Sequence, residues 1–205
     1  MTHFRHVLPF FGACLLLLAG CGGRSAPTAY YMLDSGVTTP NIENVSAPAL
    51  QLRKVDIPGY LDRSAIVTRD SGGVRVTLAE FHAWAEPLSG GMQRVLTEVM
   101  TPRLLERGVL LQPLDDDSRG PLQIFVEVLR FDGTLGQEAT LEVRWTLRNS
   151  DDRTVARGAF VEREPVGTTY ESLVRAQSRL LVRFGENLAP RLAAGAGAEQ
   201  RRAVR

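Results

Sequence analysis

The segment from Ala139 to Arg148 alternates strictly between two kinds of side chain, and no other feature of the sequence restricts the fold as strongly. Its odd positions carry Ala, Leu, Val, Trp and Leu, whereas its even positions carry Thr, Glu, Arg, Thr and Arg. Because successive side chains of a strand point to opposite faces of a sheet, this pattern predicts a strand with one face in the core and one in water. A slip of one residue would turn the apolar set toward solvent, so we expect a fixed register.

Other segments predict that this strand belongs to a sheet covered by helices. Residues 122–131 and 155–164 are also β-like and complete a meander with it. Apolar residues recur at spacings of three and four from Leu88 to Arg107 and again after Thr168, as in helices with one buried face. Further strands are expected at 30–33, 50–57, 65–69, 74–78 and 109–111. We therefore expect one α/β domain, a mixed β-sheet of seven or eight strands with two main amphipathic helices packed on it.

Local residues also predict where the helices begin and end. Pro102 removes a backbone donor, so the first helix should end near Met100, with Pro102 opening a further turn. Thr168 and Glu171 have the spacing of a capping box at the start of the second helix. After Pro190 the chain offers almost nothing to bury, so residues 193–205 are expected to be disordered.

The amino-terminal residues predict an exported precursor. A short polar start containing Arg5 precedes an apolar run from Val7 to Leu18, which is the pattern of a signal peptide. Since about 20 apolar residues are needed to cross a bilayer, this run is too short for a spanning helix. The sequence Leu-Ala-Gly-Cys at 18–21 resembles the lipobox of bacterial lipoproteins, in which the thiol receives diacylglycerol before the preceding peptide bond is cut. Cys21 would then be the first mature residue.

This resemblance divides the chain and predicts its location. Residues 1–20 are the signal peptide, 21–29 the lipidated cysteine with a flexible tether, 30–192 the folded domain and 193–205 the tail. Two or more acyl chains, such as palmitate, hold a protein stably at a membrane. In Gram-negative lipoproteins an aspartate after the cysteine favours inner-membrane retention, but here Gly22 follows. We therefore expect sorting to the outer membrane, on its periplasmic face.

Composition narrows the chemistry that the mature chain could perform. Loss of Arg5 leaves equal numbers of basic and acidic residues, so no basic excess indicates nucleic acid as a partner. Cys14 is removed and Cys21 is alkylated, which leaves no thiol for a disulfide or a zinc site. His82 is the only histidine left, which excludes a multi-histidine metal site. We predict no metal, no cofactor and no enzymatic activity.

Two short motifs resemble known functional sites, a protease nucleophile and a calcium-binding loop. Asp-Ser-Gly-Gly at 70–73 resembles the segment around the nucleophile of trypsin-like proteases, but His82 follows this serine, which reverses the chain order of that family. The segment lies between two predicted strands and is expected to be a hairpin turn. Residues 115–120 begin with three aspartates, yet the twelfth position of a calcium loop starting there is Val126 instead of glutamate, so a solvated loop is expected.

Two segments, 57–63 and 81–88, carry more aromatic and charged groups than loops require. Their candidate residues are Tyr60, Asp62, Arg63, Trp84 and Glu86. The structural explanation is that Tyr60 and Trp84 cover the edge of the core while Asp62 and Arg63 pair locally. The alternative is a surface that binds a partner, since Trp, Tyr and Arg dominate interface energies.

Taken in order along the chain, these segments resemble the PqiC/YmbA family of ABC-type transport auxiliary lipoproteins. The likeness rests on the lipobox, on Tyr-Tyr-Met-Leu at 30–33, on 55–69 with its Pro-Gly-Tyr-Leu-Asp-Arg motif, and on Trp-Ala-Glu-Pro-Leu at 84–88; it covers about Tyr30 to Leu192. The resemblance implies an α/β mixed-sheet domain. It also implies a periplasmic, non-enzymatic component of an MCE-type lipid transport system, which works beside an inner-membrane permease and a periplasmic MCE protein on envelope phospholipids.

The resemblance leads to a hypothesis for the role of the chain, which is to dock the periplasmic MCE subunit at the outer membrane. The face expected to bind this partner carries the five candidates of the two aromatic segments. Oligomeric MCE partners make a homo-oligomeric ring of this chain compatible with the role. The alternatives are a carrier that shelters lipid in its own cavity and an adaptor for a cell-wall enzyme, with an enzyme that depends on His82 as a distant third.

Overall fold

The computed structural model describes residues 26–37, 47–112 and 121–203. Four strands precede one helix and four more precede a second, which is the order that the sequence predicts. The strands are β1 (Ala29–Tyr31), β2 (Ala49–Leu52), β3 (Ala65–Arg69), β4 (Val76–Trp84), β5 (Leu110–Gln112), β6 (Leu122–Gly133), β7 (Glu138–Asn149) and β8 (Thr154–Pro165), and the helices are α2 (Leu88–Leu105) and α3 (Tyr170–Ala203). Cys21 and the acidic segment 115–120 lie outside the described residues.

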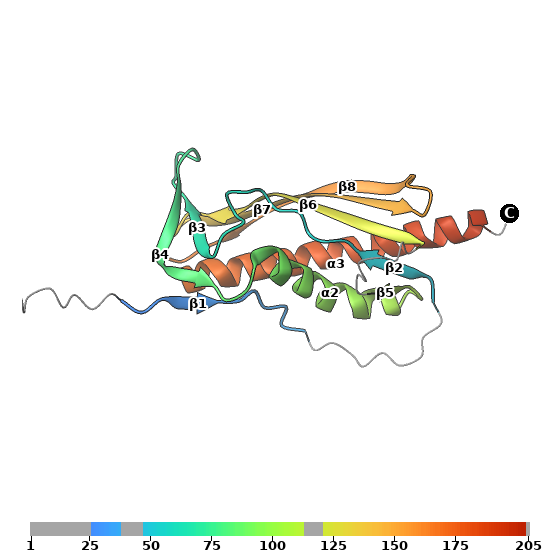
Figure 1. The fold of residues 1–205 in the computed structure, drawn as a ribbon, viewed down its shortest axis with the longest axis horizontal. Coiled ribbons are helices and arrows are strands. Elements are labelled where there is room, and N and C mark those ends of the chain that lie inside the picture. The colour runs from blue at the N-terminus through green and yellow to red at the C-terminus, as the bar shows by residue number, and fades with distance from the viewer. Residues whose placement is uncertain (1–25, 38–46, 113–120, 204–205) are drawn as a thin grey trace, which may run out of the picture.

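The eight strands form two mixed sheets, whereas the sequence suggests one (Figure 1). The larger sheet has the order β5-β2-β6-β7-β8 and the smaller sheet the order β1-β4-β3. Strands β6, β7 and β8 make the predicted antiparallel meander, while β2 pairs parallel with both β5 and β6. In the smaller sheet, β1 runs parallel to β4 of the antiparallel β3–β4 hairpin. The predicted fold class, one domain of mixed strands with two helices, is confirmed.

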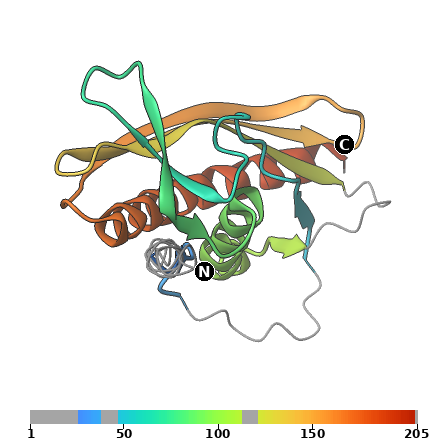
Figure 2. The same ribbon diagram turned by 60° about the vertical axis from the view of Figure 1, so that its left-hand side comes forward.

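Strand β7 confirms the alternation that fixes its register. Its apolar positions are all buried, whereas Arg144 between them is exposed. The buried face of β7 packs on α3, and α3 also packs against α2. Both helices therefore lie on one side of the larger sheet, as Figures 1 and 2 show. No helix in the described part of the chain is long and apolar enough to cross a membrane.

Helix α2 does not end near Met100 as the sequence suggests, but passes through Pro102 to Leu105. Leu104 is fully buried, so the last turn is held by the core. The side chain of Arg103 also donates to the Val99 carbonyl (2.9 Å). Burial and this side-chain bond offset the single backbone donor that the proline removes.

The beginning and the end of α3 also differ from the prediction. The cap is Thr169, whose hydroxyl accepts a bond from the Ser172 amide (3.2 Å), so Thr168 is not the capping residue. The helix continues to Ala203, and the prediction of a disordered tail at 193–205 is wrong for the residues described. Small residues allow this because they bring the helix close to the sheet: a Cβ on Gly195 would lie 2.7 Å from the Leu147 side chain.

Candidate functional site

The two aromatic segments that the sequence singles out meet at the base of the β3–β4 hairpin. Because β3 and β4 pair antiparallel, the residues before β3 lie beside the residues after β4. The Trp84 amide donates to the Ser64 carbonyl (2.7 Å), and a tight turn closes when the Leu61 amide donates to the Pro58 carbonyl (2.8 Å). The structure therefore brings segments 57–63 and 81–88 into one region.

The five candidate side chains in this region have different surroundings. Trp84 is 6% exposed and belongs to the core. Glu86 pairs with Arg94 (2.6 Å), and Arg63 donates to the Gly59 carbonyl (3.1 Å) instead of pairing with Asp62. Tyr60 and Glu86 are half-buried. Of the five candidates, only Asp62 and Arg63 are exposed. The structural explanation therefore holds for Tyr60 and Trp84.

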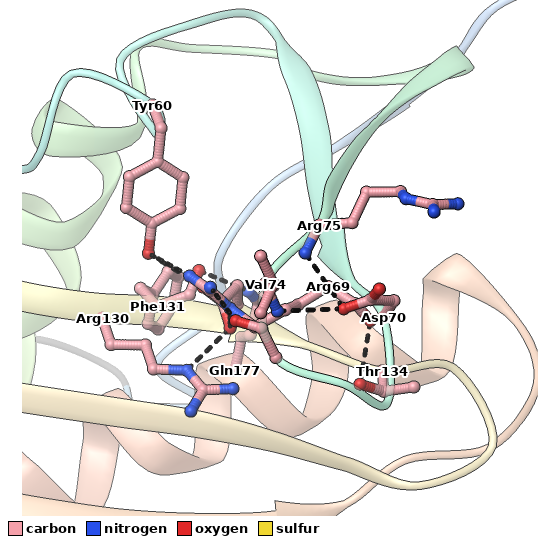
Figure 3. A network of polar contacts seen from close by, with 11 residues as sticks. Tyr60, Arg69, Asp70, Val74, Arg75, Arg130, Phe131, Thr134 and Gln177 are labelled. Atoms are coloured by element: carbon pink, nitrogen blue, oxygen red, sulfur yellow. Dashed lines mark hydrogen bonds and ion pairs between the residues drawn. The ribbon is translucent and has the colours of Figure 1, made fainter.

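Tyr60 reaches a buried carboxylate, Asp132, that the sequence does not single out (Figure 3). The Tyr60 hydroxyl donates to Asp132 Oδ2 (2.8 Å). Arg69 donates to the same oxygen through Nη2 (2.7 Å), and Arg130 donates to Oδ1 through Nε (2.8 Å). The side chain of Asp132 is 0% exposed, so these bonds replace its contacts with water. We call Tyr60, Arg69, Arg130 and Asp132 the Asp132 network.

The charges of the Asp132 network are fixed at neutral pH. Burial alone raises the pKa of Asp132, but the hydrogen bonds from Arg69, Arg130 and Tyr60 outweigh it and hold that pKa below its usual range. Burial, followed by the hydrogen bond to Asp132, raises the pKa of Tyr60 to about 12. The network therefore contains one carboxylate, two guanidinium groups and a neutral phenol.

The Asp132 network connects the smaller sheet to the larger one. Tyr60 lies on the turn before β3, Arg69 is the last residue of β3, and Asp132 lies near the end of β6 in the larger sheet. Thr134 adds a bond from its hydroxyl to the Arg69 carbonyl (2.9 Å). No backbone ladder joins β3 to β6, so these side chains supply polar contacts between the smaller sheet and the larger one, beside the core that the two sheets share.

His82 and the segment 70–73 also make contacts within the fold. The His82 Nδ1 atom lies 2.9 Å from the Tyr31 hydroxyl, and its ring stacks on Tyr170 with centroids 4.1 Å apart, so His82 connects β1, β4 and the start of α3. The predicted hairpin turn is confirmed, because the Gly73 amide donates to the Asp70 carbonyl (3.0 Å) between β3 and β4. Gly73 has a φ of 74°, which glycine adopts without strain.

An open groove of about 750 Å³ lies between residues 30–36 and α3. Tyr30 and Met32 on its β1 side are 69% and 53% exposed. Arg179 and Arg183 on the α3 side form ion pairs with Glu164 at 2.8 and 2.7 Å. Arg175 on the same helix pairs with Glu171 at 2.7 Å, so the groove has charged side chains on its α3 side and exposed apolar side chains on its β1 side. It is open to solvent and does not enclose a ligand.

Comparison with known proteins identifies relatives of the whole domain. A family model described as "ABC-type transport auxiliary lipoprotein component" matches residues 31–189. An uncharacterized protein with a crystal structure is 20% identical in sequence to this chain, and the two structures align with a TM-score of 0.66. The match covers 82% of this chain and 99% of that one. Protein XCC0632 from Xanthomonas campestris, of the DUF330 family, is 18% identical with a TM-score of 0.69, and the match covers 85% and 99%. No curated protein matches the sequence significantly. At these identities the two structures show the fold alone.

Proposed function

The chain belongs to the family of ABC-type transport auxiliary lipoproteins, and from this premise we propose that it holds a periplasmic transport subunit at the outer membrane. The family is one of transport auxiliary components and is not an enzyme class. More specifically, the partner is an MCE-domain protein that works with an inner-membrane permease, and the cargo is envelope phospholipid. The family match over residues 31–189 is the observation that carries the proposal.

Attachment to the membrane is assigned to Cys21, through the acyl chains that a lipobox cysteine receives. Residues 26–28, which lead into β1, are exposed and have no regular structure, as a tether requires. Cys21→Ser should abolish incorporation of radiolabelled palmitate, and label that persists would contradict the anchor. Gly22 favours the outer membrane as the destination. Recovery of the native protein in inner-membrane fractions would contradict that destination.

The packing of the domain supports docking over lipid carriage. The space between the larger sheet and α3 is filled by side chains such as Phe184, which is 1% exposed and lies 5.3 Å from Phe160 between ring centroids. The groove beside β1 is open to solvent, whereas a carrier needs an enclosed apolar cavity for an acyl chain. Lipid recovered by extraction of the purified protein would favour the carrier instead.

The partner surface is proposed at the base of the β3–β4 hairpin, where Asp62 and Arg63 are exposed. Tyr60, Trp84 and Glu86 support this surface through their internal contacts. Reversing both charges with Asp62→Lys and Arg63→Glu should reduce the yield of MCE protein in a crosslinked pull-down from membranes, with no change in thermal stability. The matched control is Asp151→Lys with Arg153→Glu, in the exposed turn between β7 and β8.

The outcomes of this pull-down separate the parts of the proposal. If both double variants recover the partner as well as the wild type does, the surface is wrong but the function stands. If the wild type recovers a cell-wall enzyme, or no partner, the MCE role itself is wrong. The mass of the crosslinked lipoprotein would also measure whether copies of this chain form the proposed ring.

A further inference from the structure

The β3–β4 hairpin exposes aliphatic side chains at its tip. Val74 is 90% exposed, Leu78 is 47% and Val76 is 39%. They are three of the six large hydrophobic side chains that the described residues expose. Figures 1 and 2 show this hairpin standing away from the rest of the domain. Clustered apolar exposure on one projecting element indicates a contact with something apolar outside the domain.

The hairpin is held rigidly, so this exposure is not that of a loose loop. The Asp70 carboxylate accepts bonds from the Val74 and Arg75 amides at 3.2 and 3.1 Å, and the Asp70 amide donates to the Arg75 carbonyl (2.9 Å). Arg69, one residue earlier, is fixed by the Asp132 network (Figure 3). The tip therefore carries one acidic and one basic side chain, Asp70 and Arg75, beside its aliphatic groups, and the Asp70 carboxylate is engaged by the amides of the turn. Exposed aliphatic groups next to an arginine suit a membrane interface.

The length of the tether brings this tip within reach of the proposed lipid anchor. Strand β1 runs parallel to β4 with Ala29 opposite His82, and Figure 1 shows the β3–β4 hairpin turning away from the line of β1. The chain from Cys21 to Ala29 spans at most about 28 Å when extended. The distance from His82 to Val76 along β4 is about 20 Å at the rise of a strand. The acylated residue and the hairpin tip can therefore reach one plane.

We propose that the hairpin tip, formed by Val74, Arg75, Val76 and Leu78, rests in the same membrane interface that holds the acyl chains of Cys21. The aliphatic side chains enter the boundary between headgroups and acyl chains, and Arg75 faces anionic headgroups. The inference deepens the proposed function and rests on its lipid anchor. The tip adds to that anchor a second contact that sets the orientation of the domain.

A fluorescent label tests this contact, because the mature chain has no free thiol once Cys14 is removed and Cys21 is acylated. Val74→Cys labelled with NBD is compared with Val161→Cys on β8, a residue that is 58% exposed in a different part of the domain. Both lipidated variants are reconstituted in phosphatidylethanolamine and phosphatidylglycerol vesicles. We expect the label at 74 to shift to the blue, to be quenched by nitroxide lipids and to be protected several-fold from iodide, and the label at 161 to show none of these changes.

The controls distinguish failure of the hairpin from failure of the anchor. Circular dichroism confirms that both variants fold, and flotation with the vesicles confirms that both are anchored. If the anchored protein leaves the label at 74 as accessible to iodide as the label at 161, the hairpin proposal is overturned while the anchor stands. If neither variant floats, the anchor is overturned and the hairpin proposal with it.

Discussion

Replacing Asp132 with Asn tests whether the Asp132 network holds the two sheets together. The amide keeps the size of the side chain but removes its charge, so Arg69 and Arg130 lose their anionic partner. Breaking a buried ion pair by removing one member costs about 3–5 kcal/mol. The side chains of Arg69 and Arg130 are 18% and 33% exposed, so water can solvate them in part. We therefore expect Asp132→Asn to lower the free energy of unfolding by about 3 kcal/mol, the lower end of that range.

Urea unfolding followed by circular dichroism measures this loss, and a thermal melt checks it. For a domain of this size each kcal/mol lowers Tm by about 2–4 °C, so Tm should fall by about 6–12 °C. The matched control is Asp152→Asn, because Asp152 also pairs with an arginine, Arg148, at 2.9 Å but is 74% exposed. That pair should be worth less than about 1 kcal/mol. A loss in Asp132→Asn no larger than that of the control would refute the reasoning.

The pH dependence gives a second readout for the same variant. Because the pKa of Asp132 is lowered in the folded protein, its contribution to stability is present above the unfolded pKa of about 3.9 and is lost as the pH falls through the folded pKa. The wild type is therefore expected to lose its advantage over Asp132→Asn as the pH drops below about 4. A difference in unfolding free energy that stays constant over this range would contradict the assigned protonation state.

Other measurements probe separate parts of the fold. With its pKa raised to about 12, Tyr60 should give an ionisation step near pH 12 in an absorbance titration, and Tyr60→Phe should lack that step. Since an unfolded tyrosine ionises near pH 10, the stability that Tyr60 contributes should be lost as the pH rises from about 10 toward 12. Gly158→Ala would bring a Cβ within 2.9 Å of the Trp145 ring and should cost about 1–3 kcal/mol in urea unfolding. The exposed Gly72→Ala should be near neutral, and equal losses would argue against the close contact. Amides of residues 193–199 should be protected in hydrogen exchange, whereas immediate exchange would support the disordered tail.

The strands with a strong local pattern were predictable, but their partners were not. The predicted bounds 65–69 match β3, and the meander from β6 to β8 was predicted from the alternation within β7 and the β-like composition of its two neighbours. The division into two sheets depends on which strand each edge meets, and single-strand periodicity carries no such information. Thus β2 ends at Leu52 although the sequence suggests a strand to Ile57, because only Asp56 makes a further bridge, to Glu127 of β6.

The candidate site was predictable in its composition and not in its geometry. The aromatic content of segments 57–63 and 81–88 indicates special surroundings, and both segments meet in the structure. Asp132 was missed because Asp-Gly at a strand end has the composition of an exposed turn. Its burial depends on Arg69, which lies 63 positions away in the sequence. The tail of α3 was missed for a related reason, since hydrophobic patterns do not register close packing through Ala and Gly.

The Asp132 network and the hairpin tip together would give the anchored domain an orientation. The tip and the base of the hairpin lie at opposite ends of β3, so a membrane contact at Val74 would place Asp62 and Arg63 up to about 15 Å farther from the bilayer, at the rise of a strand. The base would then face the periplasm, the side from which the proposed transport partner would approach. Arg69 and Asp132 connect the smaller sheet to the larger one. The angle of the hairpin to the membrane would therefore also set the angle of α3 and the rest of the domain. Asp132→Asn should therefore loosen the orientation of the anchored protein even under conditions in which the variant remains folded.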